Sequence, residues 1–217
     1  MRYWRHYRQR PSVTQKILIA NVIIFLADVF FSISGIDLFP SVPGSAIVDL
    51  FALTPTLAIK GFVWQFVTYM FLHANFVHLF VNMFTLLTFA PQIEMEMGSE
   101  RFLIFYILCG IGSSILHVLL TGITPIPMVG ASGAIFGILT AFGLMFPRAT
   151  VVFMFLFPMP ALTAVVVFGL IELLEGIAYP GSSIAHFGHL GGIITAFILI
   201  KFFNFGRKRD WIWVWEY

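Results

Sequence analysis

Six apolar runs divide the chain, and each is long enough, or nearly so, to cross a lipid bilayer. A spanning helix needs about 20 mostly apolar residues, because each residue adds only about 1.5 Å to its length. We therefore predict six spans, with bounds good to a few residues, over 17–34, 76–94, 102–121, 131–146, 161–178 and 187–203. This pattern predicts an all-α polytopic membrane protein.

Two stretches between the runs do not fit a spanning helix. The stretch 151–160 is apolar but contains Pro158 and Pro160, which break helices, so we predict a connection that dips along the membrane face. Residues 35–75 form the one long loop between predicted spans. We expect it to lie in the outer membrane interface because it is rich in apolar side chains, namely Phe51, Leu53, Leu57, Phe62, Trp64 and Phe66.

The composition supports a membrane protein and excludes several other classes. Hydrophobic residues make up 59% of the chain and charged residues only 10%, against about 25% charged residues in a typical soluble domain. So few charges could not cover the apolar surface of a soluble fold. Disorder and coiled coils are excluded too, and the single cysteine, Cys109, excludes a disulfide scaffold.

The distribution of positive charge predicts the orientation. With six spans and the N-terminus inside, Lys60 is the one basic residue of the twelve that falls in an outer segment. This asymmetry follows the positive-inside rule and favours cytoplasmic termini. We predict a basic tail over 1–16, one domain over 17–203, and a basic, aromatic tail over 204–217. Because the basic N-terminus abuts an apolar run that is too long for a signal peptide, we predict a retained first span and no nucleic-acid partner.

Polar side chains inside predicted spans are costly and point to function. His78 and Asn82 lie in the second span, Ser132 in the fourth, and His186 and His189 in the sixth. These three spans all run from outside to inside. The polar groups therefore share one depth, roughly 8–13 Å below the outer end of each span at about 1.5 Å per residue.

This set of side chains favours nucleophilic catalysis. A serine and a histidine can form a nucleophile–base pair if their helices approach closely, and an amide and a second imidazole can stabilise an oxyanion. Both His186 and His189 could be the base, but the register of the glycines that follow favours His189. Small residues four apart permit the close approach, and they are Gly133, Gly137, Gly188, Gly192 and Ala196.

Three stretches resemble the signature motifs of the rhomboid intramembrane serine proteases. They are HANFVHLFVN at 73–82, GASG at 130–133 and HLGG at 189–192, in the family's order and at similar separations. The stretch 94–101 also resembles the family's inner turn after its second helix. The resemblance covers about residues 15–203 and implies a six-helix rhomboid-like bundle with both termini on the cytoplasmic side.

The resemblance also implies a role for each matching residue. Ser132 would be the nucleophile and His189 its general base, forming a dyad. His78, Asn82 and the backbone N–H of Ser132 would donate to the oxyanion. Further residues would act structurally: His73 would cap the long loop, and Gly130, Gly133, Phe136 and Gly192 would support the site.

Two positions depart from the family's pattern. Gln65 follows Trp64 where many members have arginine, so the outer loop would be anchored differently. Phe136 replaces a frequent tyrosine, and it can stack on the catalytic histidine but has no hydroxyl to donate.

The implied function is an intramembrane endopeptidase without cofactor or metal that cleaves transmembrane segments of other proteins from within the bilayer. The short basic N-terminus favours a bacterial inner membrane. A catalytically inactive relative that binds membrane proteins remains an alternative, as does, less favoured, a transporter, although we find no internal repeat. The sequence does not specify the substrate, the oligomeric state or the role of Asp28.

Two alternatives concern the site itself. Four histidines (His73, His78, His186 and His189) could form a zinc site, but the set lacks a cysteine or a suitably placed carboxylate. Glu172 and Glu175 near the outer end of the fifth span could orient His189 as a third triad member. A dyad agrees better with the family.

Overall fold

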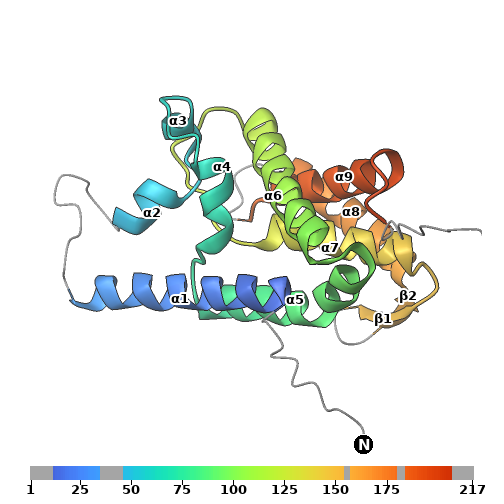
Figure 1. Ribbon diagram of the computed structural model, residues 1–217. Coiled ribbons are helices and arrows are strands. Elements are labelled where there is room, and N and C mark those ends of the chain that lie inside the picture. The colour runs from blue at the N-terminus through green and yellow to red at the C-terminus, as the bar shows by residue number, and fades with distance from the viewer. Residues whose placement is uncertain (1–11, 35–45, 154–156, 180–183, 207–217) are drawn as a thin grey trace, which may run out of the picture.

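The computed structural model describes residues 12–34, 46–153, 157–179 and 184–206. Within these ranges the chain is mostly helical, and one two-stranded sheet lies at the edge of the helices (Figure 1). Most of the two basic tails predicted at 1–16 and 204–217 lies outside the described residues, so their side of the membrane stays a prediction.

Every apolar run that predicted a span is a helix in the structure. The helices are α1 (Val13–Ser34), α5 (Phe76–Met97), α6 (Ser99–Thr121), α7 (Ser132–Met145), α8 (Ala161–Ala178) and α9 (His186–Phe202). Four of them, α1, α5, α6 and α8, are long and apolar enough to cross a membrane. Helices α7 and α9 have 14 and 17 residues and are shorter than a typical span.

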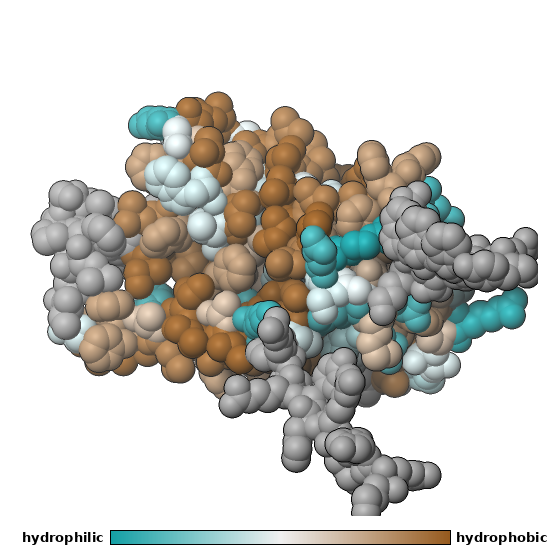
Figure 2. Space-filling model, viewed as in Figure 1, coloured by the Kyte–Doolittle hydropathy of each residue, from teal (hydrophilic) through white to brown (hydrophobic). Residues whose placement is uncertain are grey.

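The surface of the bundle is that of an integral membrane protein. Large apolar side chains are exposed along the long helices, for example Ile23 and Phe30 on α1 and Leu174 on α8. Figure 2 shows this apolar surface spread over α1, α5 and α6. Exposed patches of this extent require an apolar partner, and here that partner is lipid.

Helix α1 begins four residues before the predicted span because a carboxylate from another helix caps its N-terminus. Glu94 near the end of α5 accepts hydrogen bonds from the backbone N–H groups of Val13 and Thr14, at 2.8 and 2.9 Å. The hydroxyls of Thr14 and Ser99 donate to the same carboxylate. These bonds satisfy N–H groups that a helix start leaves without partners, and they tie α1 to the turn between α5 and α6.

Helix α7 lies in the middle of the bundle. It contacts α5, α6, α8 and α9, and most of its residues are buried. Its small residues let its neighbours approach closely: a Cβ added at Gly137 would stand 2.6 Å from the Cys109 sulfur of α6, too near for a real contact. Because α7 is surrounded by protein, it does not need the length of a lipid-exposed span.

The long outer loop contains short helices that the sequence does not predict. They are α2 (Ala46–Phe51), α3 (Pro55–Ala58), α4 (Gln65–Thr68) and a 3₁₀ turn η1 (Tyr69–Phe71). Elements of three to six residues are too short to show a helical period. Phe51 and Trp64 are exposed, as an interfacial position requires, but the depth of this loop in a membrane stays a prediction.

Gln65 anchors this loop from the inside. Its side chain is fully buried, accepts a hydrogen bond from the backbone N–H of Thr54 at 3.1 Å, and donates to the carbonyl of Leu50 at 3.3 Å. Leu53 and Met128 also exchange two backbone hydrogen bonds. The neutral amide of Gln65 thus holds the loop through hydrogen bonds to two of its backbone groups.

The connection at 151–160 differs from the prediction. It contains an antiparallel hairpin of β1 (Thr150–Phe153) and β2 (Phe157–Pro160), in which Thr150 faces Pro160 and Val152 faces Pro158. The prolines exclude a helix, as expected. A two-stranded sheet tolerates them because each strand has one unpaired edge, where a missing N–H costs no ladder bond. Over the residues that the structure describes, the fold is therefore all-α apart from this pair of strands.

Candidate active site

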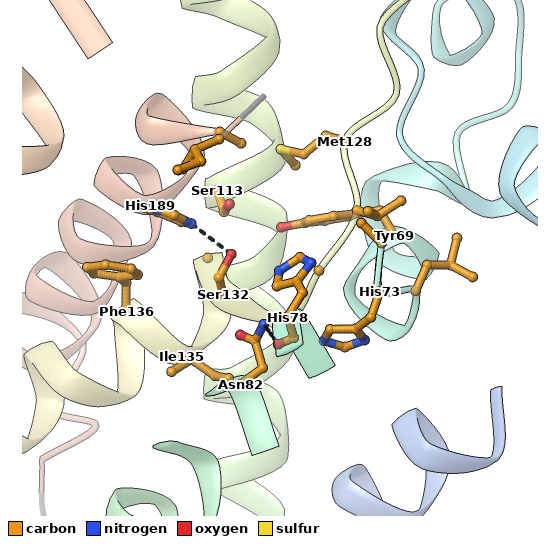
Figure 3. A pocket seen from close by; sticks show the side chains of 18 of the residues that line it. Tyr69, His73, His78, Asn82, Ser113, Met128, Ser132, Ile135, Phe136 and His189 are labelled. Atoms are coloured by element: carbon orange, nitrogen blue, oxygen red, sulfur yellow. Dashed lines mark hydrogen bonds between the residues drawn. The ribbon is translucent and has the colours of Figure 1, made fainter. Parts of the chain in front are cut away.

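Ser132 and His189 meet at the ends of two helices. Ser132 is the first residue of α7, His189 is the fourth residue of α9, and Ser132 Oγ lies 2.8 Å from His189 Nε2 (Figure 3). This is the length of a hydrogen bond, and the serine hydroxyl can donate it if the proton of the imidazole is on Nδ1. The sequence-predicted nucleophile and base are thus in direct contact.

Glycines allow the two helices to approach closely. A Cβ added at Gly192 would overlap the carbonyl oxygen of Gly133 and lie 2.8 Å from its carbonyl carbon. On the other side of α7, a Cβ at Gly133 would overlap the hydroxyl of Ser113 on α6. Gly133 and Gly192 therefore allow the backbones of α7 and α9 to touch, which the Ser132–His189 contact requires, whereas Gly137 makes room for Cys109 of α6.

Phe136 holds the imidazole from one face. Its ring lies 4.5 Å from the ring of His189 with an angle of 18° between the planes, so the two rings are stacked. The stacking expected for phenylalanine at this position is present. It restricts rotation of the His189 ring without adding a hydrogen bond.

His78 lies on the side of Ser132 away from His189 (Figure 3), close to Gly130. A Cβ at Gly130 would lie 2.6 Å from the His78 ring. The backbone angle φ of Gly130 is +122°, a value that residues other than glycine rarely adopt. Gly130 is itself fixed by its N–H, which donates to the carbonyl of Tyr69 at 3.0 Å. Glycine at this position therefore leaves the space that His78 occupies beside Ser132.

Asn82 lies one helical turn after His78 and is 5% exposed. Its amide donates to the carbonyl of His78 at 2.9 Å. An amide nitrogen carries two protons, so one remains for a second acceptor. Asn82, His78, Ser132 and His189 line one cavity of about 890 Å³.

The start of α7 adds backbone donors. The first N–H groups of a helix have no acceptor within the helix, and the helix dipole makes this end attractive to negative charge. Because α7 begins at Ser132, the backbone N–H of Ser132 is one of these groups.

His73 lies at the end of the outer loop, beside His78. It is 5% exposed, and its ring meets the His78 ring edge to face at 5.0 Å. Burial, together with repulsion from His78, lowers the pKa of His73 to about 3, so its ring is neutral at physiological pH. Its role as a cap of the loop stays a prediction.

His189 has one close neighbour that the predicted dyad does not include. Glu172 on α8 is 8% exposed, and its Oε2 lies 3.0 Å from His189 Nδ1 and 2.8 Å from His186 Nδ1. Two glutamates near the outer end of the predicted fifth span indicated that a carboxylate could reach His189. Which helix these glutamates face depends on the rotation of α8 about its axis.

Glu172, His186 and His189 also form a group of residue types that can bind a metal ion. The argument from sequence against zinc relied on the absence of a suitably placed carboxylate, and Glu172 corrects that premise. Both nitrogen–oxygen distances are those of hydrogen bonds. Zinc at about 2.0–2.2 Å from each ligand would hold the ligand atoms farther apart, at about 3.3 Å.

The chain is similar in sequence to known proteins. The family model of the Rhomboid domain matches residues 60–204. The chain is 31% identical over 188 residues to the rhomboid protease GluP of Bacillus subtilis (strain 168), covering 87% of this chain and 34% of that protein. It is 30% identical over 162 residues to RHOMBOID-like protein 5 of Arabidopsis thaliana, covering 74% and 51%. The chain therefore spans about a third to a half of the length of these relatives.

Proposed function

The chain belongs to the rhomboid family, and from this premise we propose that it is an intramembrane serine endopeptidase. The observation that carries the proposal is the 2.8 Å contact between Ser132 Oγ and His189 Nε2 in a cavity that also receives His78 and Asn82. The match of the GASG and HLGG motifs at these two residues supports the same roles.

In the proposed mechanism, Ser132 Oγ attacks the carbonyl carbon of the scissile peptide bond while His189 Nε2 takes its proton. The resulting oxyanion accepts hydrogen bonds from the Ser132 backbone N–H, the second proton of the Asn82 amide and His78. His189 then gives the proton to the leaving amine, and the peptide bond breaks. Water hydrolyses the acyl ester by the same route, with His189 again as the base.

We further propose that the four long helices and the two shorter ones, α7 and α9, make up six membrane spans and that both termini are cytoplasmic. The positive-inside count supports this orientation. Helix α7 is short because its N-terminal end stops inside the ring of longer helices, at the level of the cavity. Such a position brings water to Ser132, since non-helical backbone at membrane depth is tolerated where it lines a wet cavity.

The proposed substrates are transmembrane segments of other proteins that enter from the bilayer. A helical substrate must unwind locally before Ser132 can reach its carbonyl carbon, because the helix shields its peptide bonds. Segments with helix breakers and small residues near the cleavage site are therefore preferred. The proposed location is a bacterial inner membrane.

The test is cleavage of a single-span reporter in proteoliposomes by the wild type and by Ser132→Ala. Ser114→Ala is the matched control, because Ser114 is a buried serine on α6 that does not line the cavity and whose hydroxyl bonds to the backbone carbonyls of Ile111 and Phe66. We expect cleavage by the wild type and the control, and none by Ser132→Ala. Binding of the reporter without cleavage by the wild type would favour the inactive, binding relative.

A further inference from the structure

Two glutamates and two histidines face each other across α8 and α9. Glu172 and Glu175 are three residues apart on α8, and His186 and His189 are three apart on α9, so each pair shares a helix face. Glu172 Oε2 lies 3.0 Å from Nδ1 of His189 and 2.8 Å from Nδ1 of His186. Glu175 contacts His186 at 3.5 Å, and its side chain is 48% exposed.

We propose that Glu172 is a positioning residue that holds His189 in the tautomer needed for catalysis, making the dyad a Ser132–His189–Glu172 triad. This inference rests on the proposed function. His189 can accept the Ser132 proton only if Nε2 carries none, and the imidazole proton must then be on Nδ1. The group that faces Nδ1 is the carboxylate of Glu172, which favours this tautomer because it can only accept a hydrogen bond.

The carboxylate also stabilises the charged state that catalysis creates. When His189 takes the proton of Ser132, its ring becomes positive next to a negative oxygen, in a buried place where charges attract more strongly than in water. The Nδ1 contact of His189 is not aligned as a hydrogen bond in the structure. Catalytic hydrogen bonds are often loose without substrate and tighten when charge develops.

His186 explains how a carboxylate can remain at this position. It is 5% exposed and is hydrogen bonded through Nδ1 to the same oxygen of Glu172. A buried carboxylate needs such partners because an unpaired buried charge is unstable. His186 thus fixes Glu172, which in turn orients His189.

The test compares Glu172→Gln with Glu175→Gln in the reporter assay. Both substitutions replace a glutamate of α8 by glutamine. They differ in one respect, because the carboxylate of Glu172 contacts His189 and that of Glu175 contacts His186. We expect Glu172→Gln to lower kcat at least tenfold with KM within twofold of the wild type, because its amide can donate to Nδ1 and favour the wrong tautomer. Removing the carboxylate of a serine-protease triad costs up to about 10⁴ in kcat. We expect Glu175→Gln to resemble the wild type.

The readout must separate positioning from stability. Active sites are counted by complete labelling with a fluorophosphonate, kcat is expressed per active site, and melting temperature is measured on the same preparation. A lower melting temperature with an unchanged kcat per active site would overturn the proposal, as would equal kcat values for the two glutamine variants.

Two further measurements complete the test. If Glu172→Gln does not fold, Glu172→Asp tests the proposal instead, because its carboxylate lies one methylene farther from His189. A reduced kcat of this variant supports the proposal, and an undiminished kcat overturns it. Activity that is lost in EDTA and restored by zinc would assign the cluster to a metal instead. A wild type that neither cleaves nor is labelled would refute the proposed protease function itself, whereas an active wild type with an equally active Glu172→Gln refutes this inference alone.

Discussion

Replacing Gly192 by alanine tests whether backbone contact between α7 and α9 builds the site. The added Cβ would lie 2.8 Å from the carbonyl carbon of Gly133 and overlap its oxygen, whereas ordinary contacts of a Cβ begin at 3.4 Å. Both obstacles are backbone atoms, so no side-chain rotation relieves them. The helices must therefore separate by more than 0.6 Å, the difference between 2.8 and 3.4 Å, to relieve the contact with the carbonyl carbon. Clearing the carbonyl oxygen of Gly133 as well requires a separation of about 1 Å or more.

A separation of about 1 Å would lengthen the 2.8 Å contact between Ser132 and His189 past the upper limit of a good hydrogen bond, about 3.2 Å. Misplacement on this scale costs about 10² in rate. Overpacking itself costs about 1–3 kcal/mol of stability. We expect Gly192→Ala to lose about 10² or more in turnover and in the rate of Ser132 labelling, with a moderately lower melting temperature.

Gly169→Ala on α8 is the matched control. A Cβ there would meet one side-chain atom, Ile193 Cδ1, at an ordinary 3.8 Å, and alanine is a better helix former than glycine. We expect it to have wild-type turnover and equal or higher stability. The reasoning is refuted if Gly192→Ala keeps the turnover and labelling rate of Gly169→Ala.

Three further predictions follow from the site and its surroundings. His189→Ala should remove cleavage, whereas His186→Ala should lower it far less, because it removes a partner of Glu172 and leaves the base in place; reporter turnover with reversed phenotypes would show that the wrong histidine is assigned as base. Asn82→Ala should lower turnover by about 10²–10³, the usual loss for one oxyanion donor, with little change in substrate binding; a lower melting temperature with normal turnover would make Asn82 purely structural. The pKa of His73 is about 3 in the folded state and about 6.5 in the unfolded chain, so the folded state binds the proton more weakly. The free energy of unfolding should therefore fall as the pH drops from 6.5 towards 3, by at most about 1.4 kcal/mol per pH unit. Melting temperatures at pH 7 and pH 5 check this, and His73→Asn should melt with a weaker pH dependence than the wild type.

Much of the fold could be predicted because the bilayer imposes long apolar runs. All six runs are helices. The predicted first residue is least accurate for α1, because Glu94, eighty residues away in the sequence, caps the N-terminus of this helix. The short helices of the outer loop and the hairpin β1–β2 could not be predicted. Their elements have three to six residues, and distant backbone contacts such as Leu53 with Met128 hold part of the loop in place.

The site could be predicted where local motifs carry the chemistry. The spacing of four between Gly133 and Gly137, and between Gly188 and Gly192, predicted a close helix approach, and the motifs around Ser132 and His189 predicted which side chains meet. The sequence offered both Glu172 and Glu175 as possible partners of His189, and the structure brings Glu172 to it. Which glutamate faces His189 depends on how α8 is rotated against α9. No local pattern encodes that angle.

The central claim is that His189 activates Ser132 as a nucleophile. The most direct measurement is mass spectrometry of the purified protein after reaction with a fluorophosphonate, followed by mapping of the modified peptide. We predict one adduct, on Ser132, in the wild type, and no adduct at this residue in Ser132→Ala or, on the same time scale, in His189→Ala. An adduct on another serine, or equal labelling of Ser132 without His189, would contradict the claim.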